Sequence, residues 1–469
     1  MLFTEFRFFL FLGILLALYW ALPGNRQRKV LLLLASYAFY GAWDWRFLSL
    51  IFLSTIVDYI VGLRLSGTAD FRKRRNWVTV SLVVNLGLLG VFKYFNFFAD
   101  SAVDFLGLLG WEADGVFLQL VLPVGISFYT FQTLSYTLDI YRNKLEPTRS
   151  LLDFSLFVAF FPQLVAGPII RASDFLYQLD TKKVFQRIDY RWALMLFLVG
   201  FIKKACIADN LAPYVDAFFA DPDPYGTLQA WLGVLAFSTQ LYCDFSGYSD
   251  MAIATAGLFG FRLRDNFNRP FTAENISEFW HRWHISLSSW LRDYLYIPLG
   301  GSRGTRLQRY RNLMITMFLG GLWHGAAWGY IVWGVMHGAG LIAHNIWLTL
   351  TAGRFKVPVL LGICMTFFYW NITMVAFRAE DIAQAWYLWQ KMFDFSAGAT
   401  TFVPGMSDLV VALGLAVLMC LHATRNSVLA QKFWRSLPRP LFAVFYGAAF
   451  SLVVSFRAIE YQPFIYFQF

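Results

Sequence analysis

Residues 313–350 read LMITMFLGGLWHGAAWGYIVWGVMHGAGLIAHNIWLTL and contain no Asp, Glu, Lys or Arg. A membrane-spanning helix needs roughly 20 predominantly apolar residues, because the hydrocarbon core of a bilayer is about 30 Å thick. We therefore expect two spans in this stretch, at residues 313–328 and 330–350. Three histidines interrupt its apolar character, and an ionisable side chain inside a span indicates a functional site.

Similar apolar stretches recur along the whole chain of 469 residues. The mean hydropathy is +0.52 and charged residues make up 14%, whereas soluble domains carry about a quarter. The other expected spans are residues 8–22, 30–42, 47–63, 77–98, 115–137, 192–208, 228–242, 357–377, 409–421 and 441–456. Because no long polar block separates them, we expect an all-α polytopic membrane protein. It would form one membrane domain over residues 1–469, with about 11–12 transmembrane helices.

The placement of charge predicts the orientation of the chain. The net charge is +10, but Lys and Arg fall in short clusters between apolar stretches, as membrane topology requires. We therefore expect no nucleic-acid partner. Basic residues 26–29 and 72–75 are predicted to be cytoplasmic and the acidic stretch 100–114 external, which gives an external N-terminus. Residues 22–25 do not form a small-x-small cleavage site, so residues 8–22 are expected to remain as the first span.

One apolar segment, residues 151–170, carries basic segments on both sides. A segment with both ends in the cytoplasm is re-entrant rather than spanning. Pro162 and Pro168 would break a helix there, and irregular backbone at membrane depth is tolerated only inside protein or beside a wet cavity. We expect a re-entrant loop that lines a cavity. The alternative is a miscounted span.

Residues 262–311 form the longest polar stretch. Asn275 followed by Glu278 resembles a capping box at a helix start, and Pro298 ends the helical pattern. Between them the apolar residues recur at helical spacing on one face: Trp283, Leu287, Trp290, Leu291 and Tyr294. This pattern predicts an amphipathic helix that lies at the cytoplasmic interface or dips into the protein.

His324 is the strongest candidate for chemistry, in the segment Gly320-Gly321-Leu-Trp-His324-Gly325. Small residues let neighbouring helices approach closely, or leave space for a substrate beside the imidazole. A histidine that is merely packed against a neighbouring carbonyl is an equal alternative.

The remaining polar candidates have weaker support. His281 and His284 are three residues apart and could share a metal on one helix face, but no second ligand pair completes a site; we expect no metal. His337 and His344 are expected to be packing residues and His422 interfacial. Two acids near a span, Asp244 and Asp250, could orient a histidine or cap a broken helix, and the structural role is favoured.

Several longer motifs occur in order along the chain. They are NRPF at residues 268–271, EFWHRWHISLS at 278–288, LRDYLYIPLGG at 291–301 and GGLWHG at 320–325, with further matches at 122–132, 161–168 and 244–250. Together they resemble the signature of the bacterial membrane-bound O-acyltransferases (MBOAT family). The similarity covers residues 8 to about 378 and is greatest to members of the alginate O-acetylation type.

This resemblance implies a ring of membrane helices around a central tunnel, with the catalytic His324 near its middle and His284 at the family's second polar position. It implies transfer of an acetyl group from cytoplasmic acetyl-CoA to an extracytoplasmic, alginate-like polysaccharide. It also implies a bacterial inner-membrane location among membrane lipid, and a periplasmic partner of the SGNH-esterase-like class that receives the acetyl group.

The residue types suit such a reaction. An imidazole titrates near pH ~6.5 and can accept a proton from an attacking hydroxyl. His284 is one candidate donor to the oxyanion. Three basic residues, Arg282, Arg292 and Arg303, could attract CoA phosphates, although the positive-inside pattern explains them equally well.

Other functions remain open. Peptidoglycan is an alternative acceptor. A transporter or flippase predicts inverted repeats, which the sequence does not contain. A non-catalytic scaffold of a polysaccharide export complex would tolerate the loss of His324.

Overall fold

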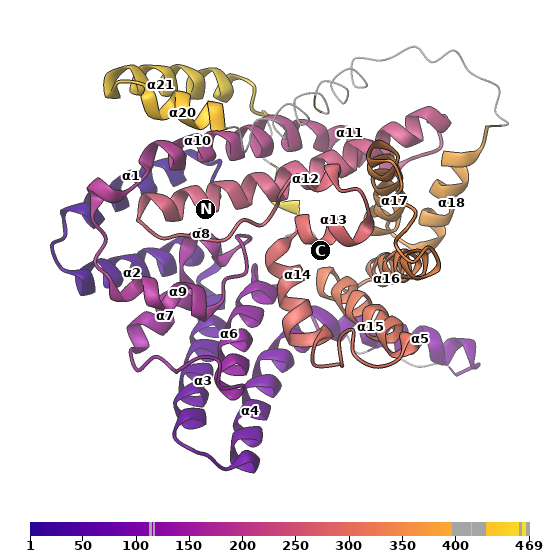
Figure 1. The fold of residues 1–469 in the computed structure, drawn as a ribbon, viewed down its shortest axis with the longest axis horizontal. Helices are drawn as coiled ribbons and strands as arrows, with labels where there is room; N and C mark the ends of the chain where they lie inside the picture. Colours follow the sequence, from indigo (N-terminus) through magenta and orange to yellow (C-terminus); the bar gives the residue numbers. More distant parts are fainter. Residues whose placement is uncertain (112–114, 116–117, 396–413, 415–427, 459–461, 466–469) are drawn as a thin grey trace. The chain divides into compact units, whose positions relative to one another are not determined.

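The computed structural model describes residues 1–111, 115, 118–395, 414, 428–458 and 462–465. Every regular element in this part of the chain is helical, as expected (Figure 1). The chain forms two compact units. The first comprises Met1–Ile188 and Thr255–Arg264, and the second Asp189–Ala254 and Asp265–Phe469. A single membrane domain remains a prediction.

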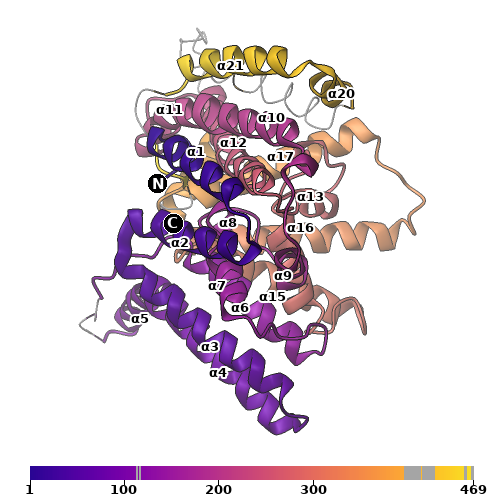
Figure 2. The same cartoon turned by 90° about the vertical axis from the view of Figure 1, so that its left-hand side faces the viewer.

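Besides the end of α12, the described residues of the first unit form α1 (Phe6–Ala21), α2 (Asn25–Asp44), α3 (Leu48–Ser66), α4 (Phe71–Leu89), α5 (Phe95–Leu108), α6 (Ile126–Tyr141), α7 (Leu151–Ala159), α8 (Phe161–Leu164) and α9 (Ala172–Asp180). Helices α3, α4 and α6 pack together, and Figure 2 shows α3 and α4 running side by side. Asp58 is buried between them and accepts hydrogen bonds from Asn85 (2.8 Å), Thr137 (3.1 Å) and Ser81. These donors satisfy a carboxylate that burial would otherwise destabilise.

The expected span at residues 115–137 is wrong over residues 118–125, which are not helical. The helix begins only at Ile126, after a non-helical stretch that contains Pro123. Gly125 caps it with φ at +76°, a left-handed conformation that glycine adopts without strain. A Cβ at Gly125 would also lie 2.7 Å from the Leu164 carbonyl oxygen. The turn therefore requires glycine both for its backbone conformation and because a side chain would have no space.

The apolar segment 151–170 is broken where its prolines predicted. Helix α7 stops at Ala159, and the four residues of α8 follow a kink at Phe160. Nine residues of helix cover only about 13 Å, which is less than half of the hydrocarbon thickness. The segment is almost entirely buried in protein, as a non-spanning loop at membrane depth must be. Its re-entrant topology remains a prediction.

The second unit contains α10 (Tyr190–Phe201), a π-helical segment (Ile202–Ala208), α11 (Asp209–Ala220), α12 (Thr227–Leu258, to Ala254 in this unit), α13 (Ile276–Arg282), α14 (Ile285–Leu291), α15 (Arg306–His324), α16 (Trp328–Leu350), α17 (Val359–Arg378), α18 (Ile382–Phe393), α20 (Val428–Ser436) and α21 (Arg439–Ser455). Helix α12 runs unbroken through Asp244 and Asp250. The idea that these acids cap a broken helix is therefore wrong.

Helices α15 and α16 pack against each other more extensively than any other helix pair in the described part of this unit, and Figure 1 shows them as neighbours. A Cβ on Gly321 would collide with the carbonyl oxygen of Tyr330, and one on Gly334 with that of Met317. The two backbones approach this closely only because both positions lack a side chain.

In the described part of the chain, four helical stretches are long and apolar enough to cross a membrane: Asn25–Ser66, Phe71–Leu108, Trp328–Leu350 and Val359–Arg378. The first two each contain two α-helices, and α1 and α21 are shorter apolar helices. The expected span at 313–328 is displaced, because α15 starts at Arg306 and ends at His324. The expected span at 409–421 lies outside the described residues. The total of about 11–12 spans remains a prediction.

Candidate active site

A cavity of about 390 Å³ lies within the second unit. Residues from α13, α14, α15 and α16 line it, together with the segment that follows α14: Ser277, Trp280, His281, Ile285, Leu287, Ser288, Ser289, Leu291, Arg292, Tyr296, Ser302, Arg309, Leu313, Thr316, Met317, Gly320, His324, Trp333, Leu341 and Asn345. It has the size of a pocket for a small molecule or cofactor.

One face of α15 provides the length of this cavity. Arg309, Leu313, Thr316, Gly320 and His324 follow one another at intervals of three or four residues, which places them on one helix face, and Met317 lies beside Thr316 on it. Fifteen residues of α-helix rise about 22 Å. The cavity therefore extends from the guanidinium group of Arg309 to the imidazole of His324.

His324 is the last residue of α15 and is only 3% exposed. Its ring contacts Trp333 and Phe377, with centroid distances of 4.9 and 5.4 Å. The chain leaves the helix at Gly325, which is extended and whose Cβ would overlap the Tyr330 ring. The wall beside the imidazole is thus almost wholly aromatic.

The glycines next to His324 serve two purposes, which are close packing of the helices and space for a ligand. Gly321 and Gly325 allow close packing, because a Cβ at either position would overlap atoms of Tyr330. Gly320 instead faces the cavity, where a Cβ would approach Leu291 Cδ1 to 3.3 Å. One residue of the three therefore leaves space for a ligand.

The predicted amphipathic helix starts as expected but is not continuous. Asn275 accepts a hydrogen bond from the Glu278 backbone nitrogen at 2.9 Å, which confirms the cap. The helix then breaks at His284, whose φ of 43° is left-handed, a conformation that is rare in residues other than glycine. His281, on α13, is exposed, and its Nδ1 lies 2.6 Å from the Ser277 carbonyl oxygen. His281 and His284 therefore do not share a helix face, and the described residues contain no metal-ligand cluster.

His284 is fully buried and held by polar contacts. Its Nδ1 lies 3.1 Å from the Oδ1 of Asn266, which also accepts hydrogen bonds from the backbone nitrogen (3.2 Å) and hydroxyl (2.8 Å) of Ser286. Because that oxygen is already an acceptor, we assign the imidazole proton to Nδ1. Burial lowers the pKa of His284, which lies outside the four apolar stretches, to about 3. The ring is therefore neutral.

The two candidate histidines have different surroundings. His324 lines the cavity and His284 does not. The indole of Trp323 contacts both, at 5.8 Å from the His284 ring and 5.1 Å from the His324 ring. Sequence reasoning missed Asn266, because nothing in the chain links it to a histidine 18 residues away.

Of the predicted phosphate-binding residues, only Arg292 lines the cavity, and it pairs with Asp293 at 2.7 Å. Arg282 is bonded to Glu278 and to the Thr272 hydroxyl (2.7 Å). Arg303 is exposed and does not line the cavity, although its neighbour Ser302 does. The sequence analysis missed Arg309, which lines the cavity and whose Nε is buried with no hydrogen-bond partner among the described residues.

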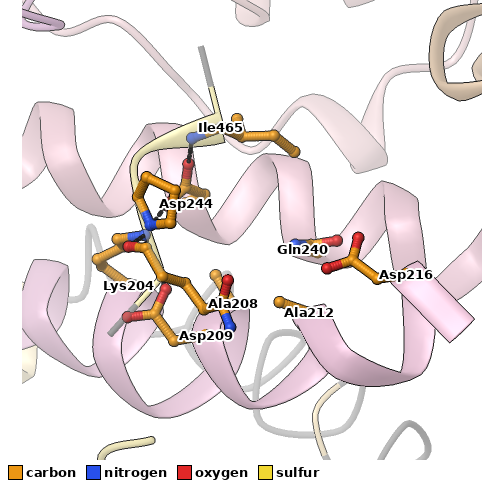
Figure 3. Close-up of a pocket in the computed structure, with 10 residues that line it drawn as sticks. Lys204, Ala208, Asp209, Ala212, Asp216, Gln240, Asp244 and Ile465 are labelled. Atoms are coloured by element: carbon orange, nitrogen blue, oxygen red, sulfur yellow. Dashed lines mark hydrogen bonds and ion pairs between the residues drawn. The ribbon is translucent and has the colours of Figure 1, made fainter. Parts of the chain in front are cut away.

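A second polar cluster joins the π-helical segment and α11 to α12 (Figure 3). Lys204 Nζ lies 2.6 Å from an oxygen of Asp244 and 2.7 Å from one of Asp209, and Lys203 pairs with Asp250 at 2.7 Å. The predicted acids therefore bind lysines rather than a histidine. Two lysines inside the apolar stretch 192–208 were the signal for this cluster, because charges at such positions usually pair.

The cluster also holds a segment near the end of the chain. The backbone nitrogen of Ile465 donates to Asp244 at 2.7 Å (Figure 3). Phe464, fully buried, packs against Phe245 with ring centroids 5.8 Å apart. Phe245 in turn meets the edge of the His284 ring at 4.6 Å. The charged cluster therefore helps to position His284, through Phe464 and Phe245.

Comparison with known proteins identifies the class. Residues 144–380 match the family model of the membrane-bound O-acyltransferases. The chain belongs to this family, and it is a multi-pass membrane O-acyltransferase.

Individual relatives narrow this class. The chain is 47% identical to the probable alginate O-acetylase AlgI of Azotobacter vinelandii, over 82% of this chain and 77% of the relative. It is 40% identical to the protein of the same name from Pseudomonas putida, over 98% of both chains. It is also 39% identical to the peptidoglycan O-acetyltransferase of Helicobacter pylori, over 76% of this chain and 72% of the relative. The chain is thus similar to enzymes that O-acetylate polymers.

Proposed function

We propose that this protein takes an acetyl group from acetyl-CoA on the cytoplasmic side of the bacterial inner membrane and passes it toward an alginate-like polysaccharide outside. The observation that carries the proposal is the cavity that joins Arg309 to His324 along one face of α15. The names of the relatives support acetyl as the group and alginate as the polymer.

The charge of the cavity suits an anionic donor. Arg292 and Arg309 line it, and no Asp or Glu does so among the described residues. CoA carries phosphates at one end and its thioester at the other, so a basic entrance and a distant imidazole match its chemistry. Arg309 replaces Arg282 and Arg303 in this proposal, because neither of those two reaches the cavity.

His324 acts as the base of the transfer. It accepts the proton of the attacking hydroxyl while that oxygen bonds to the thioester carbonyl carbon. The C–S bond then breaks, and the imidazolium returns its proton to the departing thiolate. The products are an acetate ester and free CoA, and no metal is consumed or needed.

His284 supports the catalytic residue His324 without lining the cavity. Its Nδ1 proton is directed at Asn266, so the neutral ring has no second N–H to offer an oxyanion. We therefore assign it a positioning role, in which it holds Trp323 against His324, in place of the oxyanion role considered from the sequence.

The first acceptor is proposed to be a serine hydroxyl of a periplasmic partner of the SGNH-esterase-like class, which then acetylates the sugar. The family resemblance supports this step. Peptidoglycan is the second candidate polymer, because one relative is named for it.

The proposal is tested by measuring acetyl esters on exported polymer in cells carrying wild type, His324→Ala or His344→Ala at matched membrane levels. His344 lies on α16 but does not line the cavity, so it controls for the loss of a histidine. We expect the His324 variant alone to abolish acetylation. Normal acetylation by that variant would favour a scaffold, and esters on peptidoglycan alone would exclude the alginate-like acceptor.

A further inference from the structure

Aromatic rings border the cavity beside His324. Residues 325–332, which directly follow His324, do not line it, whereas Trp333 and Trp280 do. The Trp333 ring lies 4.9 Å from the His324 ring, and the Trp280 ring lies 5.7 Å from that of Trp333. Two indoles therefore form an aromatic wall beside the base, where the acyl group of a bound thioester would lie.

This wall is rigid. Trp333 is 1% exposed and packs against His337 (4.7 Å) and Phe377 (5.3 Å), and Trp280 packs against the same His337 (5.1 Å). The participating rings come from α13, α16 and α17. Protein interiors are close-packed, so a wall built from several helices cannot yield to an added methylene without strain.

The charge of the cavity sets a second limit. An acyl group with an ammonium would need a carboxylate partner, and none lines the cavity in the described part of the chain. The ionic groups that do line it, Arg292 and Arg309, would repel it.

We propose that Trp333 and Trp280 determine the acyl specificity of this enzyme, by limiting the space beside His324 so that only a short, uncharged acyl group fits. This inference rests on the proposed function and adds to it the residues that select the donor. A pocket that discriminates one methylene achieves about 10- to 200-fold, so we expect acetyl to be preferred over propionyl by that order, and over butyryl by more.

The test uses the full-length protein in lipid nanodiscs together with the periplasmic partner whose hydroxyl accepts the acyl group. Acetyl-, propionyl-, butyryl- and β-alanyl-CoA are the donors, and release of free CoA is the readout. Trp333→Ala should raise kcat/KM for butyryl-CoA relative to acetyl-CoA by about tenfold or more. Trp333→Phe keeps an aromatic ring in the wall and should shift the ratio in the same direction by less. It covers the case in which the alanine variant does not fold.

Leu313→Ala is the matched control. It removes a large side chain from the same cavity, but about 16 Å along α15 from His324, so the donor ratio should not change. An unchanged ratio in a folded, active Trp333→Phe protein would overturn the proposal, as would a wild type that uses butyryl-CoA as well as acetyl-CoA. Use of β-alanyl-CoA at the propionyl rate would overturn the charge limit.

These results separate the inference from the function beneath it. A wild-type protein that transfers acetyl and butyryl equally keeps the proposed function and loses the role of the two tryptophans. A wild type that releases CoA from none of the four donors contradicts the proposed function, and the inference falls with it.

Discussion

Arg309 and His324 lie on the same face of α15, fifteen residues apart, and both line one cavity. A guanidinium so far from the imidazole cannot take part in the bond changes there. It can hold the charged end of a donor whose reactive end reaches His324. This relationship gives each residue a distinct kinetic signature.

Arg309→Ala should weaken donor binding and leave the chemical step intact. A charge-assisted hydrogen bond contributes about 1.5–3 kcal/mol, so KM for acetyl-CoA should rise by roughly tenfold or more with little change in kcat. Steady-state kinetics on the purified protein measure both. Arg303→Ala is the control, because Arg303 is exposed and does not line the cavity. Equal effects of the two variants would mean that only the general positive charge of this region matters.

Lys204→Met should destabilise the protein strongly. The substitution leaves the buried carboxylates of Asp209 and Asp244 without their cation, and removing one partner of a buried ion pair costs about 3–5 kcal/mol. Chemical or thermal unfolding in detergent measures the loss.

Arg46→Met is the matched comparison for this prediction. Arg46 forms an ion pair with Asp44 at 2.6 Å, but its side chain is 66% exposed, and exposed pairs contribute about 0–1 kcal/mol. If both variants unfold alike, the buried cluster is not a structural anchor.

His284 should make stability depend on pH in a defined window. Its pKa in the folded protein, about 3, lies below the ordinary 6.5, so only the unfolded chain gains a proton as the pH falls below 6.5. The stability that depends on a neutral His284 is fully present above pH 6.5 and is lost as the pH falls toward 3. Between pH 6.5 and 5 the loss is about 2 kcal/mol. The fall in Tm between pH 7.5 and 5 should therefore be smaller in His284→Gln than in wild type, and an equal fall in both would show that His284 is not buried neutral.

Much of the fold follows from local sequence signals. Length and hydropathy located α2, α3, α16 and α17 to within a few residues, because a span is a property of its own residues. Pro162 marked the break between α7 and α8, and Asn275 marked the start of α13. Each of these signals acts within one or two helical turns.

The features that sequence reasoning missed depend on distant partners. At the helix break, His284 adopts a left-handed backbone conformation, for which the sequence offers no glycine as a signal. The His284 side chain is held by Asn266, which lies outside the helix. The lysines of the π-helical segment have their acids partly on α12. Arg309, on α15, lines the cavity and Arg303, in the turn before α15, does not. Tertiary packing, rather than local propensity, decides all three.

The most direct test of the account separates binding from chemistry at His324. Purified wild type and His324→Ala in nanodiscs would be compared for binding of labelled acetyl-CoA and for release of free CoA in the presence of an acceptor. The account predicts similar binding and no release above background in the variant. Normal release by His324→Ala would contradict the assignment of this residue as the base, and with it the claim that the cavity along α15 delivers the donor to a catalytic histidine.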